Sequence, residues 1–342
     1  MEVEMTEEPR MDELTARLGI PGLTFRPARG EEDYAAIASV INRSNEADGL
    51  DYTVTAEQIA NRFAHRTDFD PRRDTMLAEV GGRVIACGQV GWHRETGGAW
   101  IYRLYVSMVA EWRTAGIWEA MLEYCEHRLR QIGAGHQADG PRFLSTYADD
   151  LQREWIALLR GRGYEPVRYF YEMVRDRLED LPPTPLPPGL EIRPVRPEHY
   201  RAIWEANQEA FRDHWGYSEP KEGGFQRWLA HPNFAPDLWQ VAWDGDEVAG
   251  VAINIIDEHE NAAYNRRRGY VDDLSVRRPW RGRGLGRALL VLSLARLRDR
   301  GMTEVVLDVD TENPTGALRL YESVGFQPMR RSAVWRKPLA EK

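Results

Sequence analysis

Apolar and polar residues follow one another along the chain in an order that occurs twice. "LTFRPARGEEDYAAI" from Leu23 and "LEIRPVRPEHYRAIW" from Leu190 each read as a short strand, a turn at Arg-Pro and a helix. Apolar residues at alternate positions indicate a strand, and apolar residues three or four positions apart indicate a helix. The two stretches start 167 residues apart, which predicts two copies of one structural unit.

Both copies continue with two strands around a tight turn. The first has "MLAEVGGRVIACGQV" and the second "WQVAWDGDEVAGVAINI". The pairs Gly81-Gly82 and Asp244-Gly245 are typical of two-residue hairpins, because such turns need backbone conformations that glycine adopts readily. We therefore expect a β-hairpin at the same place in each copy.

The end of each copy is also shared. A strand and a long helix are predicted within "LYVSMVAEWRTAGIWEAMLEYCEHRL" and "LSVRRPWRGRGLGRALLVLSLARLRDRG". A further helix then stops at Gly163 or Gly325 and is followed by a last strand. The order of elements predicts an α/β fold of the α+β type, with a mixed sheet in each of two tandem units.

The clearest break in the chain is "DLPPTPLPPG" at residues 180–189, where five of ten residues are proline. Proline ends helices and central strands and favours an extended connector. The expected organisation is an N-terminal extension (1–22), a first domain (23–178), a proline-rich linker (179–189) and a second domain (190–342).

Composition narrows the class of protein. The 342 residues carry a net charge of −9, so general attraction to nucleic acid or to an acidic membrane is not expected. The acidic start "MEVEMTEEPRMDEL" is unlike a signal peptide, and no apolar run is long enough to span a bilayer. The two cysteines, Cys87 and Cys125, suit a reducing compartment and have no metal-binding spacing. We expect a cytoplasmic protein, either a monomer or a homodimer.

One turn in the second copy is unusually rich in glycine. "RGRGLG", residues 281–286, lies between the predicted strand "GYVDDLSV" and the long helix. A glycine turn at a helix N-terminus presents free N–H groups and the positive end of the helix dipole, which suits a pyrophosphate. A dinucleotide-binding turn would need a third glycine where Arg287 stands, and a P-loop would need Lys followed by Ser or Thr.

The spacing R-x-x-G-x-G, formed by Arg281, Gly284 and Gly286, resembles the phosphate turn of the GNAT N-acetyltransferases, which bind acetyl-coenzyme A. The resemblance covers about Leu190 to Leu339, in the order of elements that the family shows. It implies two tandem GNAT-like acyl-coenzyme A N-acyltransferase domains, with the active site in the second domain and with no metal.

The resemblance also assigns residues. It implies that the strand before the turn pairs with the pantetheine arm and that the N–H groups of the turn hold the pyrophosphate. The asparagine after the next strand would contact the coenzyme, and Tyr321 would lie beside its sulfur. The expected coenzyme-binding residues are Leu274, Ser275, Val276, Arg281, Gly282, Arg283, Gly284, Leu285, Gly286, Arg287 and Asn313.

Acetyl transfer to an amine needs a base, a polarised carbonyl and a donor for the leaving sulfur. Tyr321 is the expected donor, and backbone N–H groups could polarise the carbonyl. Asp272 and Asp273 are the carboxylates on the strand that leads to the turn, and strand alternation would place them on opposite faces. The choice of base between them stays open. Residues 258–260 ("EHE") and His214 are further polar candidates from loops.

The first copy departs from this pattern. Aligned at tryptophan, "WRTAGIWEAML" keeps Arg113 but has Trp118 in place of Gly286. Leu159 stands where the second copy has Tyr321. Ala115 and Glu119 replace two of the arginines. We expect the first copy to keep the fold, lose the chemistry and form walls of the acceptor cleft.

The resemblance thus implies an N-acetyltransferase that moves the acetyl group of acetyl-coenzyme A to a primary amine by direct attack in a ternary complex. The acceptor would be a small molecule or a peptide. The tandem layout is similar to that of the mycothiol synthases, which acetylate the cysteinyl amine of a sugar thiol. The alternative from another class is a non-catalytic module that binds or senses acetyl-coenzyme A.

Overall fold

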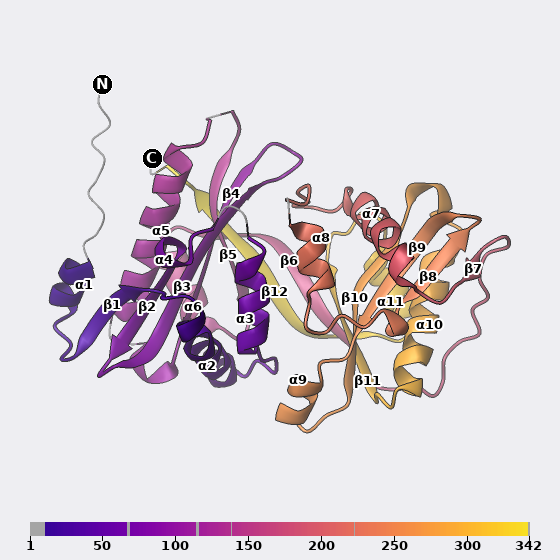
Figure 1. Ribbon diagram of the computed structural model, residues 1–342, viewed down its shortest axis with the longest axis horizontal. Helices are drawn as coiled ribbons and strands as arrows, with labels where there is room; N and C mark the ends of the chain where they lie inside the picture. Colours follow the sequence, from indigo (N-terminus) through magenta and orange to yellow (C-terminus); the bar gives the residue numbers. More distant parts are fainter. Residues whose placement is uncertain (1–10, 67–68, 114–115, 138, 222, 341–342) are drawn as a thin grey trace. The chain divides into compact units, whose positions relative to one another are not determined.

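The computed structural model describes residues 11–66, 69–113, 116–137, 139–221 and 223–340. Its contacts divide the chain into two compact units, drawn in Figure 1. The first unit comprises residues 1–167 and 334–342, and the second comprises residues 168–333.

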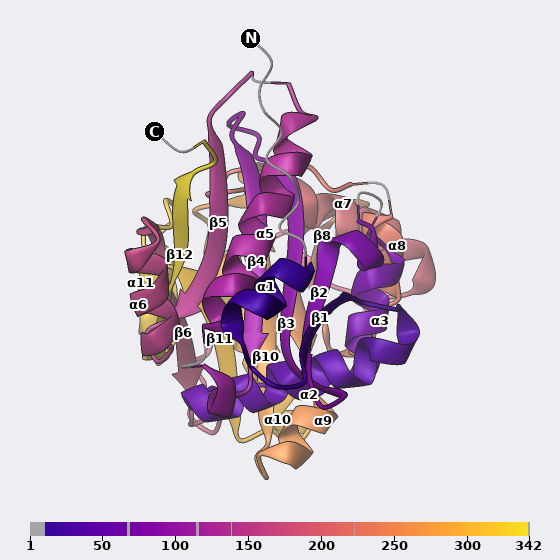
Figure 2. The ribbon, with the colours of Figure 1, turned by 90° about the vertical axis from the view of Figure 1, so that its left-hand side faces the viewer.

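The first unit is built on strands in the order β1-β2-β3-β4-β5. Neighbouring strands are antiparallel except β4 and β5, which are parallel. Helices α2 and α5 pack on β3 and β4 (Figure 2). The elements are α1 (Met11–Leu18), β1 (Leu23–Pro27), α2 (Glu31–Asp48), α3 (Ala56–Ala64), α4 (Pro71–Asp74), β2 (Thr75–Val80), β3 (Arg83–Arg94), β4 (Trp100–Met108), a 3-10 turn (Ala110–Trp112), α5 (Ile117–Ala134), β5 (Arg142–Asp149) and α6 (Arg153–Gly161).

The second unit has strands in the order β6-β11-β10-β9-β8-β7. Here β10 and β11 are the parallel pair. The elements are β6 (Glu165–Arg175), β7 (Glu191–Ile192), α7 (Tyr200–Phe211), α8 (Gly224–Leu229), β8 (Gln240–Asp244), β9 (Glu247–Ile255), α9 (Glu258–Ala263), β10 (Arg268–Val276), α10 (Leu285–Asp299), β11 (Glu304–Asp310), α11 (Ala317–Ser323) and β12 (Gln327–Pro338). Three 3-10 turns lie at Pro197–His199, Pro236–Leu238 and Arg278–Trp280.

The predicted repeat is confirmed element by element. The β2–β3 hairpin turns at Gly81 and Gly82, with φ of 58° and 79°, and the β8–β9 hairpin turns at Gly245, with φ of 56°. The long helices, the closing helices and the last strands also lie where the sequence places them. The mixed sheets with helices packed on them confirm the predicted α/β class.

The division by contacts differs from the boundaries expected at residues 178 and 190. Residues 170–175 of β6 pair with β11, so this strand of the first copy belongs mostly to the second unit. The end of β12 belongs to the first unit, where the Leu339 N–H donates to the Arg142 carbonyl at 3.0 Å. Strand ladders, rather than the proline-rich segment, therefore determine which residues form each unit.

The residues expected to form an N-terminal extension include helix α1. The side chain of Leu14 is buried, and Arg17 forms an ion pair of 2.9 Å with Glu123 of α5. The Leu18 side chain approaches Gly116, which precedes α5, to 3.0 Å of the position a Cβ would take. Helix α1 is therefore packed on the first unit. The acidic start of the chain, up to residue 10, lies outside the described residues.

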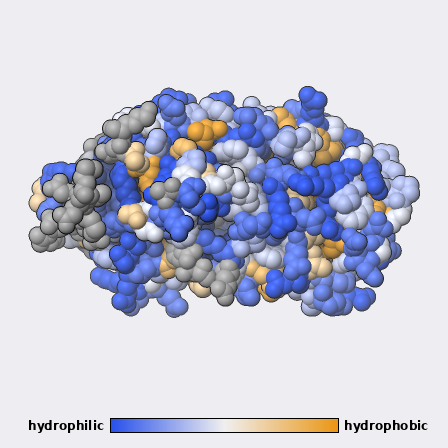
Figure 3. All heavy atoms as spheres, turned by 90° about the horizontal axis from the view of Figure 1, so that it is seen from above, coloured by the Kyte–Doolittle hydropathy of each residue, from blue (hydrophilic) through white to orange (hydrophobic). Residues whose placement is uncertain are grey.

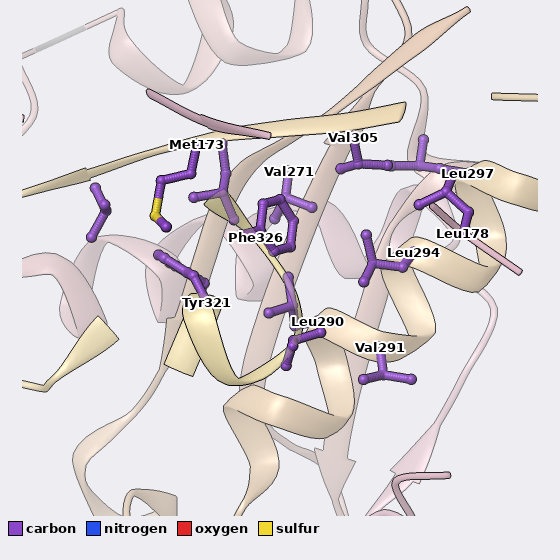
Figure 4. Close-up of a cluster of buried hydrophobic side chains, with 13 residues drawn as sticks. Met173, Leu178, Val271, Leu290, Val291, Leu294, Leu297, Val305, Tyr321 and Phe326 are labelled. Carbon is purple, nitrogen blue, oxygen red and sulfur yellow. The ribbon is translucent and has the colours of Figure 1, made fainter. Parts of the chain in front are cut away.

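Helix α10 buries its predicted apolar face in the core of the second unit. Leu290, Leu294 and Leu297 are fully buried there, as Figure 4 shows. Each such side chain stabilises the fold by about 1.5–3 kcal/mol. At Gly269 a Cβ would lie 2.8 Å from Leu297, so glycine lets the helix approach β10 closely.

Charged and polar residues dominate the face drawn in Figure 3, where apolar residues form small separate spots. Within the described ranges of the chain, none of the helices is both long and apolar enough to cross a membrane.

Candidate active site

The glycine turn of the second unit presents a row of backbone N–H groups. Gly282 and Gly284 have φ of 74° and 84°, a region that residues with a Cβ rarely adopt. The N–H of Ala288 donates to the Gly284 carbonyl at 3.1 Å, which starts the intrahelical bonding of α10. Among the described residues, the backbone N–H groups of residues 282–287 have no hydrogen-bond acceptor. These groups suit an anion such as a pyrophosphate.

Gly286 is the second residue of α10. A Cβ at this position would lie 3.6 Å from Leu320 and 3.7 Å from Val276, which are ordinary van der Waals distances. The chain's own packing therefore does not require glycine here. Glycine at this position leaves room beside the backbone, which a ligand would need in order to approach it closely.

Two arginines of the turn, Arg283 and Arg287, have side chains that could contact an anion. Arg283 is exposed and, in the described part of the chain, its side chain has no hydrogen-bond or ion-pair partner. Arg287 donates to the Ser323 hydroxyl at 2.8 Å. Both lie at the start of α10, where they can add positive charge to the row of N–H groups.

Arg281 is engaged within the protein. Its guanidinium donates to the carbonyl oxygens of Val276 (2.9 Å) and Ala210 (3.0 Å), and it forms an ion pair of 2.6 Å with Asp213. Of Arg281, expected among the coenzyme-binding residues, only the backbone is therefore placed to contact a ligand.

Strands β10 and β11 separate beside this turn. They are paired only from Arg268–Glu304 to Tyr270–Val306. Beyond that point β10 stays paired with β9 as far as Val276, and β11 stays paired with β6 as far as Asp310. The backbone of residues 274–276, expected to bind pantetheine, thus has no strand partner on its β11 side.

A β-bulge interrupts β10 at the two candidate bases. Val271 is paired with Asn254 and Asp273 with Ile253, so Asp272 is an extra residue in the ladder. The alternation on which we based the expected orientations of Asp272 and Asp273 is therefore broken at this point. Bulges redirect side chains and are frequent beside active sites.

Asp273 is held by a hydrogen-bond chain from helix α7. The Asn207 amide donates to the Asp273 carboxylate at 2.7 Å, and the Ser275 hydroxyl donates to the Asn207 oxygen at 2.7 Å. Sequence reasoning missed Asn207, because it lies 66 residues before Asp273 and forms no motif with it.

The two adjacent carboxyls have altered acidity. Burial and the neighbouring charge of Asp272 raise the pKa of Asp273, against the hydrogen bond from Asn207. Desolvation by the surrounding protein, followed by the charge of Asp308, raises the pKa of Asp272, although this residue is exposed at the surface. A carboxylate with a raised pKa is a better proton acceptor near neutral pH than an ordinary aspartate.

Tyr321 combines a buried ring with an unpaired hydroxyl. Its ring lies in the core of the second unit, 6.1 Å from that of Phe326 (Figure 4). Burial and the charge of Asp273 raise the pKa of Tyr321 to about 12, so its hydroxyl is protonated at neutral pH. Within the described chain this hydroxyl has no hydrogen-bond partner, and the residue retains 7% exposure. It is a free donor near Asp273.

Asn313 shapes the turn before α11. Its side-chain oxygen accepts from the Thr315 N–H at 2.9 Å and from the Thr315 hydroxyl at 2.6 Å. Its amide nitrogen donates to none of the described residues, which leaves that group available to a ligand.

The other polar candidates are less available, and residues 258–260, expected in a loop, begin helix α9. Glu260 is buried, pairs with Arg266 and accepts from the Tyr270 hydroxyl, so its carboxylate is already engaged. His214 follows α7, and burial lowers the pKa of its imidazole. In the described ranges, no three His, Cys, Asp or Glu side chains are grouped as metal ligands would be.

The corresponding turn of the first unit has other contacts. Arg113 forms an ion pair of 2.5 Å with Asp48, and Trp118 is buried with its ring 5.4 Å from that of Trp155. Leu159 is fully buried. Ala115, one of the substitutions noted in the sequence, lies outside the described residues.

Comparison with known sequences agrees with this geometry. The acetyltransferase (GNAT) family model matches residues 200–326. A mycothiol acetyltransferase of Catenulispora acidiphila is 30% identical over 329 residues, which cover 91% of this chain and 96% of that relative. A mycothiol acetyltransferase of Geodermatophilus obscurus is 33% identical over 316 residues, with coverage of 89% and 94%.

Solved structures show the same architecture. A GCN5-related N-acetyltransferase from Sphaerobacter thermophilus has a TM-score of 0.69 and 26% identity, and the match covers 93% of this chain and 96% of that one. A tandem GNAT protein from the clavulanic acid biosynthesis pathway has a TM-score of 0.65 at 14% identity, covering 94% and 99%, and shows likeness of fold alone. With relatives at this identity along nearly its whole length, the chain belongs to the GNAT family of acetyltransferases.

Proposed function

We propose that the second unit catalyses transfer of the acetyl group from acetyl-coenzyme A to a primary amine. The observation that carries this proposal is the separation of β10 from β11 after Tyr270 and Val306. The gap has the glycine turn at one end and the Asp273–Tyr321 pair beside it. A coenzyme between the two strands would reach both with one extended molecule.

The coenzyme would be held mainly by backbone. The free N–H groups from Gly282 to Arg287 would take the pyrophosphate, with Arg283 and Arg287 adding charge. Hydrogen bonds with a charged partner contribute roughly 1.5–3 kcal/mol each. The β10 backbone would pair with the pantetheine amides, and the amide nitrogen of Asn313 would donate to the coenzyme.

In the reaction the amine nitrogen attacks the thioester carbon while both substrates are bound. A new C–N bond forms, the C–S bond breaks, and the electron pair of that bond stays on sulfur. The proton lost by the amine passes to the Asp273 carboxylate. Asp273 is preferred to Asp272 because Asn207 orients it and because its charge acts on Tyr321.

Tyr321 would donate a hydrogen bond to the departing sulfur. Full proton transfer is unfavourable, because the pKa of Tyr321 is raised to about 12. An ordinary thiol has a pKa of about 8.5, so the thiolate is the weaker base. The hydrogen bond strengthens as negative charge develops on sulfur and so favours the transition state.

For the acceptor we propose the cysteinyl amine of a sugar thiol, since relatives over nearly the whole chain are named mycothiol acetyltransferases. The first unit would have no catalytic part of its own. The buried free thiols of Cys87 and Cys125 agree with a role in the reducing cytoplasm.

The test is release of free coenzyme A from acetyl-coenzyme A in the presence of different amines. Among small primary amines and peptides, a cysteinyl sugar amine should give the highest kcat/KM. The Gly286→Trp variant should lose this activity while remaining folded. Coenzyme binding without thiol release for any amine would show a sensor instead of an enzyme.

A further inference from the structure

Arg281 connects three parts of the second unit. Its guanidinium contacts the carbonyl at the end of β10, the Ala210 carbonyl in α7 and the Asp213 carboxylate just after α7. Asp213 also pairs with Arg278, and these two arginines hold the pKa of Asp213 well below its usual range. Asp213 therefore stays ionised at all pH values at which the protein would be assayed.

The first unit contains the same kind of contact between arginine and helix, although among the described residues Arg113 has no counterpart of the bond from Arg281 to the strand carbonyl. Arg113 donates to the Asp48 carboxylate at 2.5 and 3.0 Å and to the Ser44 carbonyl at 3.2 Å. Ser44 and Asp48 lie in the last turns of α2, whereas Ala210 lies near the end of α7 and Asp213 follows that helix. The arginine keeps these partners although Trp118 has replaced the glycine that a pyrophosphate would approach. A contact that persists without the phosphate chemistry is explained by the backbone it holds.

We propose that Asp213 is a positioning residue, which fixes the phosphate turn through Arg281 and acts on the coenzyme only by way of that turn. The inference rests on the proposed location of the coenzyme in the second unit. Without the ion pair, only the two carbonyl contacts to Val276 and Ala210 would hold the Arg281 guanidinium, and the segment entering Gly282 would relax. The N–H groups would then meet the pyrophosphate in poorer alignment.

Helix α7 would in this way set both ends of the site. Asn207 holds Asp273 at 2.7 Å, and the end of the same helix holds Arg281. The helix is therefore a common reference for the proposed base and for the phosphate turn, which must lie at a fixed separation to suit one coenzyme molecule.

The test is the Asp213→Asn variant, measured with two acetyl donors. The Kd for acetyl-coenzyme A, from isothermal titration calorimetry, should rise by about tenfold, which corresponds to loss of one well-placed charged hydrogen bond. The kcat at saturating acetyl-coenzyme A should stay close to wild type. With S-acetylpantetheine, which lacks the pyrophosphate, kcat/KM should fall much less than it does with acetyl-coenzyme A, because only the contact through Val276 is affected. Arg281→Gln should behave in the same way, and the double variant should add little to either single one.

The first unit supplies a matched control. Asp48→Asn removes the equivalent ion pair and should lower the Tm while leaving the Kd for acetyl-coenzyme A unchanged. An unchanged Kd in folded Asp213→Asn would overturn the proposal, and so would an equal loss of kcat/KM with S-acetylpantetheine. If Asp213→Asn does not fold, Arg281→Gln provides the same comparison. Failure of the proposed coenzyme site itself is recognised separately, because Gly286→Trp would then bind acetyl-coenzyme A normally.

Discussion

The glycines that precede the two long helices have similar backbone conformations but different surroundings. Gly116 and Gly284 both precede a long helix with positive φ, 75° and 84°. A Cβ at Gly284 would meet nothing within 4 Å, whereas at Gly116 it would meet Leu18 of α1 at 3.0 Å. The helix N-terminus is thus open in the second unit and covered in the first.

The residue two positions further on makes the difference larger. Gly286 leaves space, whereas Trp118 is buried against Trp155, and Arg113 lies over its ring at 4.9 Å. In the first unit, aromatic packing occupies the place that a coenzyme would take in the second.

The strands before the turns differ as well. Each hairpin partner has a glycine that faces the long helix, Gly88 in β3 and Gly250 in β9. Counted from these glycines, the third pair along the ladder contains Arg103 in the first unit and Asp273 in the second. The first ladder has no bulge at this point. The fold thus depends on ladders and core residues that both copies keep, whereas the chemistry that we propose would depend on a few side chains and one inserted residue.

The largest expected effect on coenzyme binding comes from placing the tryptophan of the first turn in the second turn. Gly286→Trp should raise the Kd for acetyl-coenzyme A by about 100-fold or more, because the indole would occupy the path of the pyrophosphate. The Tm should change little, since a Cβ fits at this position and the first unit accommodates Trp118. Calorimetric titration and thermal melting measure both quantities. Near-normal binding by the folded variant would exclude this turn as the phosphate site.

The reverse substitution, Trp118→Gly, should lower the stability of the protein without creating a second coenzyme site. Loss of a buried tryptophan costs about 3–5 kcal/mol of unfolding free energy. No second equivalent of acetyl-coenzyme A should bind, because Leu18, Leu159 and Arg103 still differ from the second unit. A titration with a stoichiometry of two would show that the first unit retains a latent site.

The next effect concerns kcat and the proposed general base, Asp273. Asp273→Asn should lower kcat by about 10²–10³-fold, the typical contribution of a positioned general base. In the wild type kcat should fall as pH drops below the raised pKa of Asp273, because the carboxylate becomes protonated. The variant should lack this acid limb. An acid limb that persists in Asp273→Asn and disappears in Asp272→Asn would transfer the role to Asp272.

The same shift makes a stability prediction of definite sign. The folded protein holds the Asp273 proton more tightly than the unfolded chain does. Unfolding free energy should therefore fall as pH rises from the ordinary aspartate value through the raised one. Asp273→Asn should reduce this decline, as denaturant titrations at several pH values would show.

A smaller effect on kcat is expected when the proposed hydrogen-bond donor to the departing sulfur is removed. Tyr321→Phe should lower kcat by about tenfold while the Kd for acetyl-coenzyme A stays within about twofold, because the ring remains and only the donor is lost. Tyr321→Leu, which copies Leu159 of the first unit, should also lower the Tm by removing part of the core. If Tyr321→Phe reduces binding and leaves turnover per bound coenzyme unchanged, the residue is structural.

The smallest expected change comes from the exposed arginine. Arg283→Glu should raise the Kd for acetyl-coenzyme A several-fold and reduce its dependence on salt, since exposed charges are screened. Arg113→Glu should leave the Kd unchanged but lower the Tm, because its side chain is buried against Asp48. Equal effects of both variants on the Kd would contradict the difference between the two turns.

Much of the fold was predictable, because the repeat, the hairpins and the glycine turn depend on local sequence. Tyr321 was named through the resemblance to the family; its hydroxyl has no partner among the described residues, and its role beside the sulfur stays a prediction. Asn207 and Asp213 were not predictable, since their partners lie more than 60 residues away and only folding brings them together. The bulge at Asp272 was missed because one extra residue in a ladder leaves no mark in an apolar pattern.

Strand β6 comes from the first copy but pairs within the second unit, which has a consequence for the evolution of the chain. A fragment beginning at Leu190 would lack β6, and β11 would then expose unpaired N–H and carbonyl groups along Val305–Asp310. Such open edges recruit other chains and lead to aggregation. A mutation that discards the first copy would thus remove part of the second unit's own sheet. Selection for a well-formed second unit would therefore be sufficient to preserve the first copy even if, as we propose, that copy has no chemistry of its own.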